Sequence, residues 1–124
     1  MLRYQINNFQ PIEAGYCHCR MCQRLAGAPV LVWATFPVQA FSYMKGIPSV
    51  YQSSVQYQRE FCGKCGTQIA FRKIERAVTV DIPLPSLDEP NIYQPEYHIW
   101  TESQVIWFDI QDRLPRHQDS EPDI

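Results

Sequence analysis

Three of the five cysteines in this 124-residue chain lie close together, as Cys17-x-Cys19-x-x-Cys22. In an extended strand side chains alternate between faces, so Cys17 and Cys19 point to one side and His18 points to the other. If the chain then turns into a helix, Cys22 returns to the side of Cys19, because residues three apart are neighbours on a helix. The spacing therefore predicts three thiolates around one zinc ion, each at about 2.3 Å from the metal.

Other interpretations of this cluster are a redox-active dithiol and a set of inert buried thiols. An iron–sulfur cluster usually takes four cysteines, so a set of three favours zinc. His18 is a candidate for the fourth ligand of the zinc, but its opposed direction on the strand disfavours it.

Composition limits the kinds of partner that the chain is expected to bind. Its length predicts one domain that can bury a core, and three Trp, seven Tyr and six Phe argue against a disordered chain. The net charge of −2, with scattered Lys and Arg, removes the electrostatic basis for binding nucleic acid. No stretch approaches the length of a membrane span, so no membrane partner is expected.

The cysteines and the first residues together predict a cytoplasmic protein. Residues 1–8 contain no apolar run and predict no secretory signal. Thiols stay reduced in the cytoplasm, and an odd number of cysteines disfavours a complete disulfide framework. Whether the chain forms a homodimer is left open by the sequence.

The pattern of short apolar runs and turn residues predicts an all-β or mostly β fold. We expect a short helical turn over residues 23–26, ended by Gly27, and a strand–turn–strand unit around Gly46-Ile47-Pro48. The expected strands are residues 2–6, 30–36, 41–45, 49–53, 56–61, 68–72 and 77–82.

The last third of the chain gives weaker signals. Four prolines predict a loop over residues 83–95. Residues 97–100 and 104–110 are expected to form late strands or a packed arm, and the polar residues 113–124 are expected to fray. We therefore predict a single domain over residues 1–116 and a polar tail over residues 117–124.

A second cysteine pair stands in Cys62-Gly63-Lys64-Cys65-Gly66, which has the sequence form of a zinc knuckle. Glycines inside and after the C-x-x-C motif let the loop turn tightly and aim backbone N–H groups at the sulfurs. Two ligands do not complete a zinc site, so a pair of reduced thiols at a tight turn is the alternative interpretation.

Four segments of the chain, in this order and spacing, resemble the glutathione-dependent formaldehyde-activating enzyme family: CHCRMCQR, GAPVLVWATF, FCGKCGT and HIWTES. Centromere protein V carries a similar domain. The resemblance covers residues 2–116 and implies a β-tent fold, in which antiparallel sheets with little helix are held by zinc.

The resemblance also implies two zinc sites. One is catalytic and uses Cys17, Cys19 and Cys22, and the other is structural and pairs an early C-x-C with the later Cys62 and Cys65. The early C-x-C is missing from this sequence. We therefore expect that Cys62 and Cys65 do not complete a zinc site from this chain alone.

The activity implied by the resemblance is that of a zinc-dependent carbon–sulfur lyase of the S-hydroxymethylglutathione synthase type. Its substrates would be glutathione or a related thiol and a small aldehyde. Arg20 and Arg24 lie beside the cluster and are candidates to bind the glutathione carboxylates. Further candidate cations are Arg72, Lys73 and Arg76, and candidate pocket walls are Tyr16 and Trp33.

A non-catalytic zinc-binding structural or interaction module is the alternative function, because a fold does not fix an activity. In such a module a fourth protein ligand, His18 or His98, would close the three-cysteine site.

Overall fold

The computed structural model describes residues 1–7 and 10–119, and strands dominate them. The mostly β fold predicted from the sequence is therefore confirmed. In chain order the elements are β1 (Arg3–Ile6), β2 (Glu13–Cys17), α1 (Arg20–Ala26), β3 (Leu31–Pro37), η1 (Val38–Ala40), β4 (Phe41–Lys45), β5 (Ser49–Gln52), β6 (Tyr57–Phe61), β7 (Gln68–Lys73), β8 (Thr79–Pro83), η2 (Leu84–Ser86), β9 (His98–Ile99) and η3 (Thr101–Ser103).

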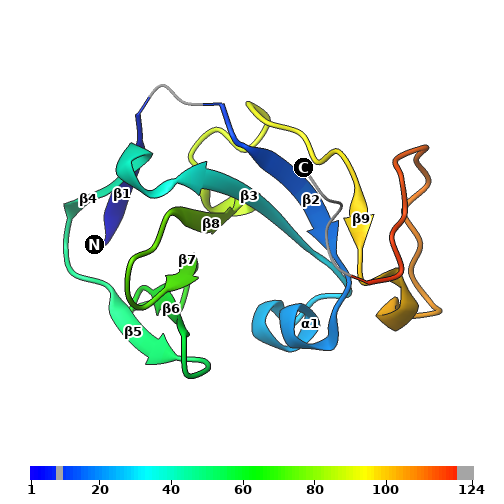
Figure 1. Ribbon diagram of the computed structural model, residues 1–124, viewed down its shortest axis with the longest axis horizontal. Coiled ribbons are helices and arrows are strands. Elements are labelled where there is room, and N and C mark those ends of the chain that lie inside the picture. Colours follow the sequence, from blue (N-terminus) through cyan, green and yellow to red (C-terminus); the bar gives the residue numbers. More distant parts are fainter. Residues whose placement is uncertain (8–9, 120–124) are drawn as a thin grey trace.

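The strands form one large sheet and one small sheet. The large sheet has the order β5-β6-β7-β8-β3-β2-β9, and the small one pairs β1 with β4. Neighbouring strands are antiparallel, except that β9 runs parallel to β2. In Figure 1, α1 lies where β2 ends and β3 begins, so the cysteine cluster is at one end of the large sheet.

The helix α1 begins at Arg20, three residues earlier than the sequence predicted. It ends at Ala26, and Gly27 is its C-cap, as expected, in the left-handed conformation with φ of 60°. Within residues 1–7 and 10–119, no helix has the length and apolar character needed to cross a membrane.

The two strands around Gly46 exist as predicted, but they belong to different sheets. β4 pairs with β1, and β5 pairs with β6. Aromatic packing supports the first pairing, since the ring of Phe41 on β4 lies 5.5 Å from the ring of Tyr4 on β1, centroid to centroid. The local turn signal could not reveal this choice of partner.

The expectation that residues 113–124 fray is wrong for residues 115–119. His98 N–H donates to the Pro115 carbonyl over 2.8 Å, His117 N–H donates to the His98 carbonyl over 2.9 Å, and Trp100 N–H donates to the Asp119 carbonyl over 2.8 Å. The segment is ordered because its backbone finds partners along β9. Residues 120–124 of the predicted tail lie outside the described residues, and 104–110 form an arm without a strand.

The hydrophobic core is centred on β3 and β8. Ala34 and Phe36 are two residues apart on β3 and share one face, and they are paired with Ile82 and Val80 on β8. All four side chains are fully buried. This packing fixes the position of β3, and β3 in turn holds β2 and the cysteine cluster through its other neighbouring edge.

A buried carboxylate joins the small sheet to the large one. Glu60 on β6 accepts hydrogen bonds from Arg72 Nε (2.6 Å) and Arg72 Nη2 (2.9 Å), from Tyr43 Oη (2.8 Å) and from Gln58 Nε2 (2.9 Å). Burial of the carboxylate works to raise the pKa of Glu60, but the bonds from Arg72 and the two other donors outweigh it and hold the pKa below its usual value.

We predict that Arg72→Met lowers the free energy of unfolding by about 3–5 kcal/mol, because it leaves the Glu60 charge buried without its cation. Denaturant unfolding at neutral pH measures this loss. Because the folded pKa of Glu60 is depressed, the stability it contributes is present above its unfolded pKa and is lost as pH falls through the folded pKa. The difference between the variant and the original chain should therefore shrink in acid.

Lys73→Met is the matched control, since Lys73 neighbours Arg72 on β7 and is exposed. Equal losses of stability in the two variants would show that the buried ion pair does not hold the sheets together.

Candidate metal centre

The junction between β2 and α1 positions the three clustered cysteines. Cys17 is the last residue of β2, and Cys19 is the N-cap of α1, with extended backbone angles (φ −65°, ψ 153°). Cys22 lies in the first turn of α1, and its backbone N–H donates to Cys19 Sγ over 3.3 Å. The strand-then-helix geometry expected from the C-x-C-x-x-C spacing is therefore what brings the sulfurs together.

The three sulfurs have the spacing of a metal site. All three ligand atoms lie within 4.8 Å of one another, and Sγ of Cys22 is 3.2 Å from Sγ of Cys17. A tetrahedral zinc ion at about 2.3 Å from each thiolate keeps the sulfurs about 3.8 Å apart. Small adjustments of the side chains would therefore close the cluster around one ion, and the site could hold a metal.

Protons are shared unequally in the crowded cluster. Hydrogen bonds from Cys17 and then Cys22 lower the pKa of Cys19, and donation to Cys19 raises the pKa of Cys17. For Cys22 the contact with Cys17 lowers the pKa, but its bond to Cys19 and its burial outweigh this and raise the pKa to about 11. A metal that binds all three thiolates must displace these protons, so its affinity falls as pH falls.

Trp33 supports the cluster from the neighbouring strand. It lies on β3 opposite Gly15 of β2, and its Nε1 donates a hydrogen bond to Cys22 Sγ over 3.3 Å. An N–H group bonded to a ligand sulfur fixes its orientation and stabilises its negative charge. Tyr16, the other candidate for a pocket wall, stacks on the ring of His98, with centroids 4.6 Å apart, and lines a cavity of about 380 Å³ that none of the three cysteines lines.

The two candidate histidines bind each other and are not part of the metal-ligating group. His18 Nε2 lies 2.8 Å from His98 Nδ1, and both side chains are buried. His98 Nε2 continues the chain to Asp112, at 3.0 Å from Oδ2. Burial, followed by the neighbouring His98 and by Arg116, lowers the pKa of His18 against smaller opposing contributions from Asp109 and Asp112. Among the residues that the structure describes, the group that could hold a metal contains only Cys17, Cys19 and Cys22.

Sequence reasoning missed this histidine–aspartate chain. Alternation along the strand predicted that His18 points away from the cysteines, but nothing around His98 or Asp112 marked them as its partners. The contact depends on the parallel pairing of β2 with β9, in which Tyr16 lies opposite His98. Residues 80 positions apart are brought together by this pairing alone.

Of the predicted cations, Arg20 and Arg24 lie nearest to the cluster, on α1 itself. Both line a cavity of about 280 Å³, together with Gln23 and Trp107, and Arg20 donates a hydrogen bond to Gln23 Oε1. Arg72, Lys73 and Arg76 line a different cavity, of about 490 Å³. Arg72 is bound to Glu60, which makes it a structural residue.

The second cysteine pair lies in the turn between β6 and β7. Cys62 is buried and Cys65 is exposed, and both line a cavity of about 610 Å³ that none of the first three cysteines lines. Over residues 1–7 and 10–119, Cys62 and Cys65 do not belong to any group of three or more ligating side chains. The described residues therefore do not fit the structural zinc site that the family resemblance implies.

The fold and the cluster together define a mostly β protein with three converging cysteines that could hold a metal ion. The family model described as "Glutathione-dependent formaldehyde-activating enzyme" matches residues 1–103. The chain belongs to this family, which connects it with formaldehyde and glutathione. No protein of curated function matches the sequence significantly.

A solved structure shares the fold. It is the crystal structure of a Rhodobacter sphaeroides protein, which is 14% identical to this chain, with a TM-score of 0.59 over 93% of this chain and 91% of that one. At this identity the similarity supports the architecture only.

We predict that Trp33→Phe weakens metal binding about 10-fold, because removing the partner of a ligand sulfur typically costs that much affinity. Competition with a chromophoric chelator, at a temperature where the variant is folded, measures the change. Trp107→Phe is the matched control, since Trp107 is 72% exposed. Equal affinities of the two variants would show that the Trp33–Cys22 bond does not support the metal.

Proposed function

We propose that Cys17, Cys19 and Cys22 hold a zinc ion and that the protein is a zinc-dependent carbon–sulfur lyase. Its reaction would be of the S-hydroxymethylglutathione synthase type, on glutathione or a related thiol and a small aldehyde. The observation that carries the proposal is the group of three converging thiols with no fourth ligand among the described residues. Family membership supports the choice of substrates.

Three sulfur ligands suit zinc, which accepts tetrahedral thiolate sets and keeps an open position in its catalytic sites. Zinc with three thiolates has a net charge of −1, is a modest Lewis acid, and when bound would hold one further thiol in its deprotonated form. Such a centre is suited to presenting glutathione sulfur to an electrophile.

In the proposed reaction the thiolate sulfur of glutathione adds to the carbonyl carbon of formaldehyde. A carbon–sulfur bond forms as the π bond of the carbonyl breaks, and the carbonyl oxygen takes up a proton, which balances the one that the thiol released, to give S-hydroxymethylglutathione. The reverse direction breaks the same bond and returns the thiol and the aldehyde. The protein contributes by holding both reactants in position.

Exposure of the three ligands indicates the side from which a substrate would approach. Cys17 and Cys22 are buried, whereas Cys19 is partly exposed at the N-terminal end of α1. We therefore place the incoming thiol on the Cys19 side. Trp33 would hold Cys22 through its hydrogen bond to the sulfur.

Arg20 and Arg24 are the proposed partners of the glutathione carboxylates. Both are on the helix that carries Cys22, and both line the same cavity. Arginine binds carboxylates through paired N–H donors, so the two side chains would orient the tripeptide while its sulfur is held at the centre.

We also propose a cytoplasmic location. All five cysteines are free thiols in the structure, which agrees with a reducing compartment. The same compartment contains glutathione in its thiol form.

Titration of the cobalt-substituted protein with glutathione tests the proposal. We expect the visible spectrum of the cobalt to change as glutathione binds, with tighter binding as pH rises toward the pKa of the thiol, because coordination releases a proton. Cys19→Ser should lose metal and any carbon–sulfur lyase activity, and Cys65→Ser should keep both. An unchanged spectrum at millimolar glutathione would favour the non-catalytic module instead.

Arg24→Gln tests the carboxylate site separately. We expect it to weaken glutathione binding about 10-fold, the effect of losing one hydrogen bond to a charged group. Binding of 2-mercaptoethanol, which has no carboxylate, should not change. If Arg24→Gln weakened the binding of both thiols equally, Arg24 would have a role in the folding of α1 and not in the substrate site.

A further inference from the structure

The turn that carries Cys62 and Cys65 places two thiols on a rigid loop. Cys62 N–H donates to the Thr67 carbonyl over 2.9 Å, and Gly66 N–H donates to the Cys62 carbonyl over 2.7 Å. Gly66 has φ of 82°, a conformation that glycine adopts without strain. These bonds hold the two cysteines close together between β6 and β7.

The geometry of the turn is compatible with a disulfide between the two cysteines. Residues three apart in a tight turn have Cα atoms within about 7 Å of each other, and a disulfide requires a separation of about 4.4–6.8 Å.

The two thiols differ in exposure in the way that an exchange reaction requires. Cys65 is exposed and its sulfur lies 3.1 Å from Thr67 Oγ1, whereas Cys62 is buried beside it. The hydrogen bond with the Thr67 hydroxyl, followed by backbone N–H groups and Cys62, lowers the pKa of Cys65. An exposed thiol with increased thiolate character next to a second thiol is typical of reactive cysteine pairs.

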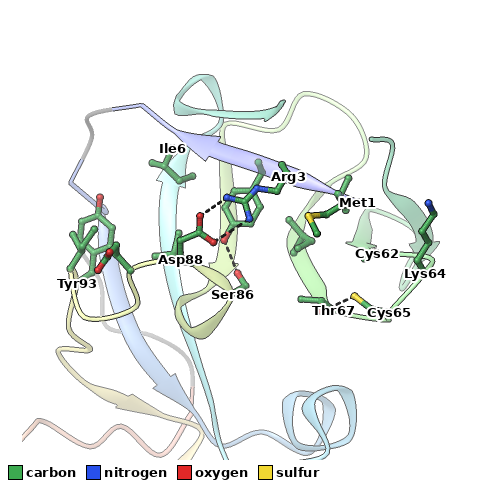
Figure 2. Close-up of a pocket in the computed structure, with 16 residues that line it drawn as sticks. Met1, Arg3, Ile6, Cys62, Lys64, Cys65, Thr67, Ser86, Asp88 and Tyr93 are labelled. Atoms are coloured by element: carbon green, nitrogen blue, oxygen red, sulfur yellow. Dashed lines mark hydrogen bonds and ion pairs between the residues drawn. The ribbon is translucent and has the colours of Figure 1, made fainter. Parts of the chain in front are cut away.

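Cys62 and Cys65 both line the 610 Å³ cavity, which is large enough for a small organic molecule. In Figure 2, Cys62, Lys64, Cys65 and Thr67 gather at one end of the cavity and Tyr93 lies at the other end. Between them, Arg3 and Asp88 form an ion pair, so their charges are already matched. The remaining walls are mainly apolar and include Leu2, Ile69, Leu87 and Ile92.

We infer that Cys65 and Cys62 form a thiol–disulfide exchange site that reacts with small organic disulfides admitted by this cavity. The inference does not rest on the function proposed for the three-cysteine centre, because the two sites share no residue. Cys62 and Cys65 are available for this chemistry because they do not complete a zinc site: they have no third metal-ligating neighbour among the described residues.

The exchange has two steps. The Cys65 thiolate attacks one sulfur of the small disulfide, forming a mixed disulfide and releasing one small thiolate, which takes up a proton. Cys62, after losing its proton to solvent, attacks the Cys65 sulfur and releases the second small thiolate. The two protein thiols are thereby oxidised by two electrons to the Cys62–Cys65 disulfide, and one small disulfide is reduced to two thiols.

Treatment of the reduced, metal-loaded full chain with glutathione disulfide tests the inference. Mass spectrometry should show the loss of two hydrogens, and peptide mapping should place the new disulfide between Cys62 and Cys65. Cys62→Ser should instead retain one glutathionyl group on Cys65, because the second step is blocked. Cys65→Ser should form no adduct in the 62–65 peptide.

Three results would overturn the inference. One is that Cys62 and Cys65 of the original chain both remain free thiols under conditions in which glutathione disulfide oxidises a small free dithiol. Another is a Cys62→Ser variant that stays unmodified while it unfolds cooperatively like the original. The last is a second zinc ion per chain that is lost in Cys62→Ser, which would restore a structural metal role to the pair. Loss of metal in Cys19→Ser tests the three-cysteine centre. The proposed lyase function and the proposed exchange site can therefore be disproved independently.

Discussion

The convergence of three sulfurs at the junction of β2 and α1 is the constraint on which the rest of the structure depends. Cys17 ends the strand, Cys19 caps the helix and Cys22 lies in its first turn, so the three ligands also define how the chain changes direction. Three thiolates at this separation repel one another unless a cation lies between them. A bound metal would therefore stabilise the junction as well as create the reactive centre.

The end of β2 connects the cysteine cluster with the C-terminal segment. Cys17, the last residue of β2, belongs to the metal-ligating group, and the next residue, His18, contacts His98 of β9. The histidine pair and the stacking of Tyr16 on His98 attach the C-terminal segment to the large sheet. The buried histidines thus serve the packing around the cluster, so a metal held by the three cysteines would have no fourth protein ligand among the described residues.

Local rules predicted the part of the structure that depends on neighbouring residues in the sequence. The alternation of a strand and the three-residue repeat of a helix were sufficient to bring Cys17, Cys19 and Cys22 together. These local rules could not predict that β4 pairs with β1 and not with β5, or that residues 115–119 pair with β9. Both contacts are backbone pairings between segments far apart in the sequence. The carboxylate of Asp112 gave no local signal for its bond to His98.

X-ray absorption spectroscopy at the zinc edge of the purified protein tests the central claim most directly, because it counts the ligands of the metal. We expect three sulfur neighbours at about 2.3 Å and one light-atom neighbour, with a fourth sulfur replacing the light atom when glutathione is added. A ligand set that contains an imidazole, or four sulfurs before any thiol is added, would contradict the open three-cysteine centre.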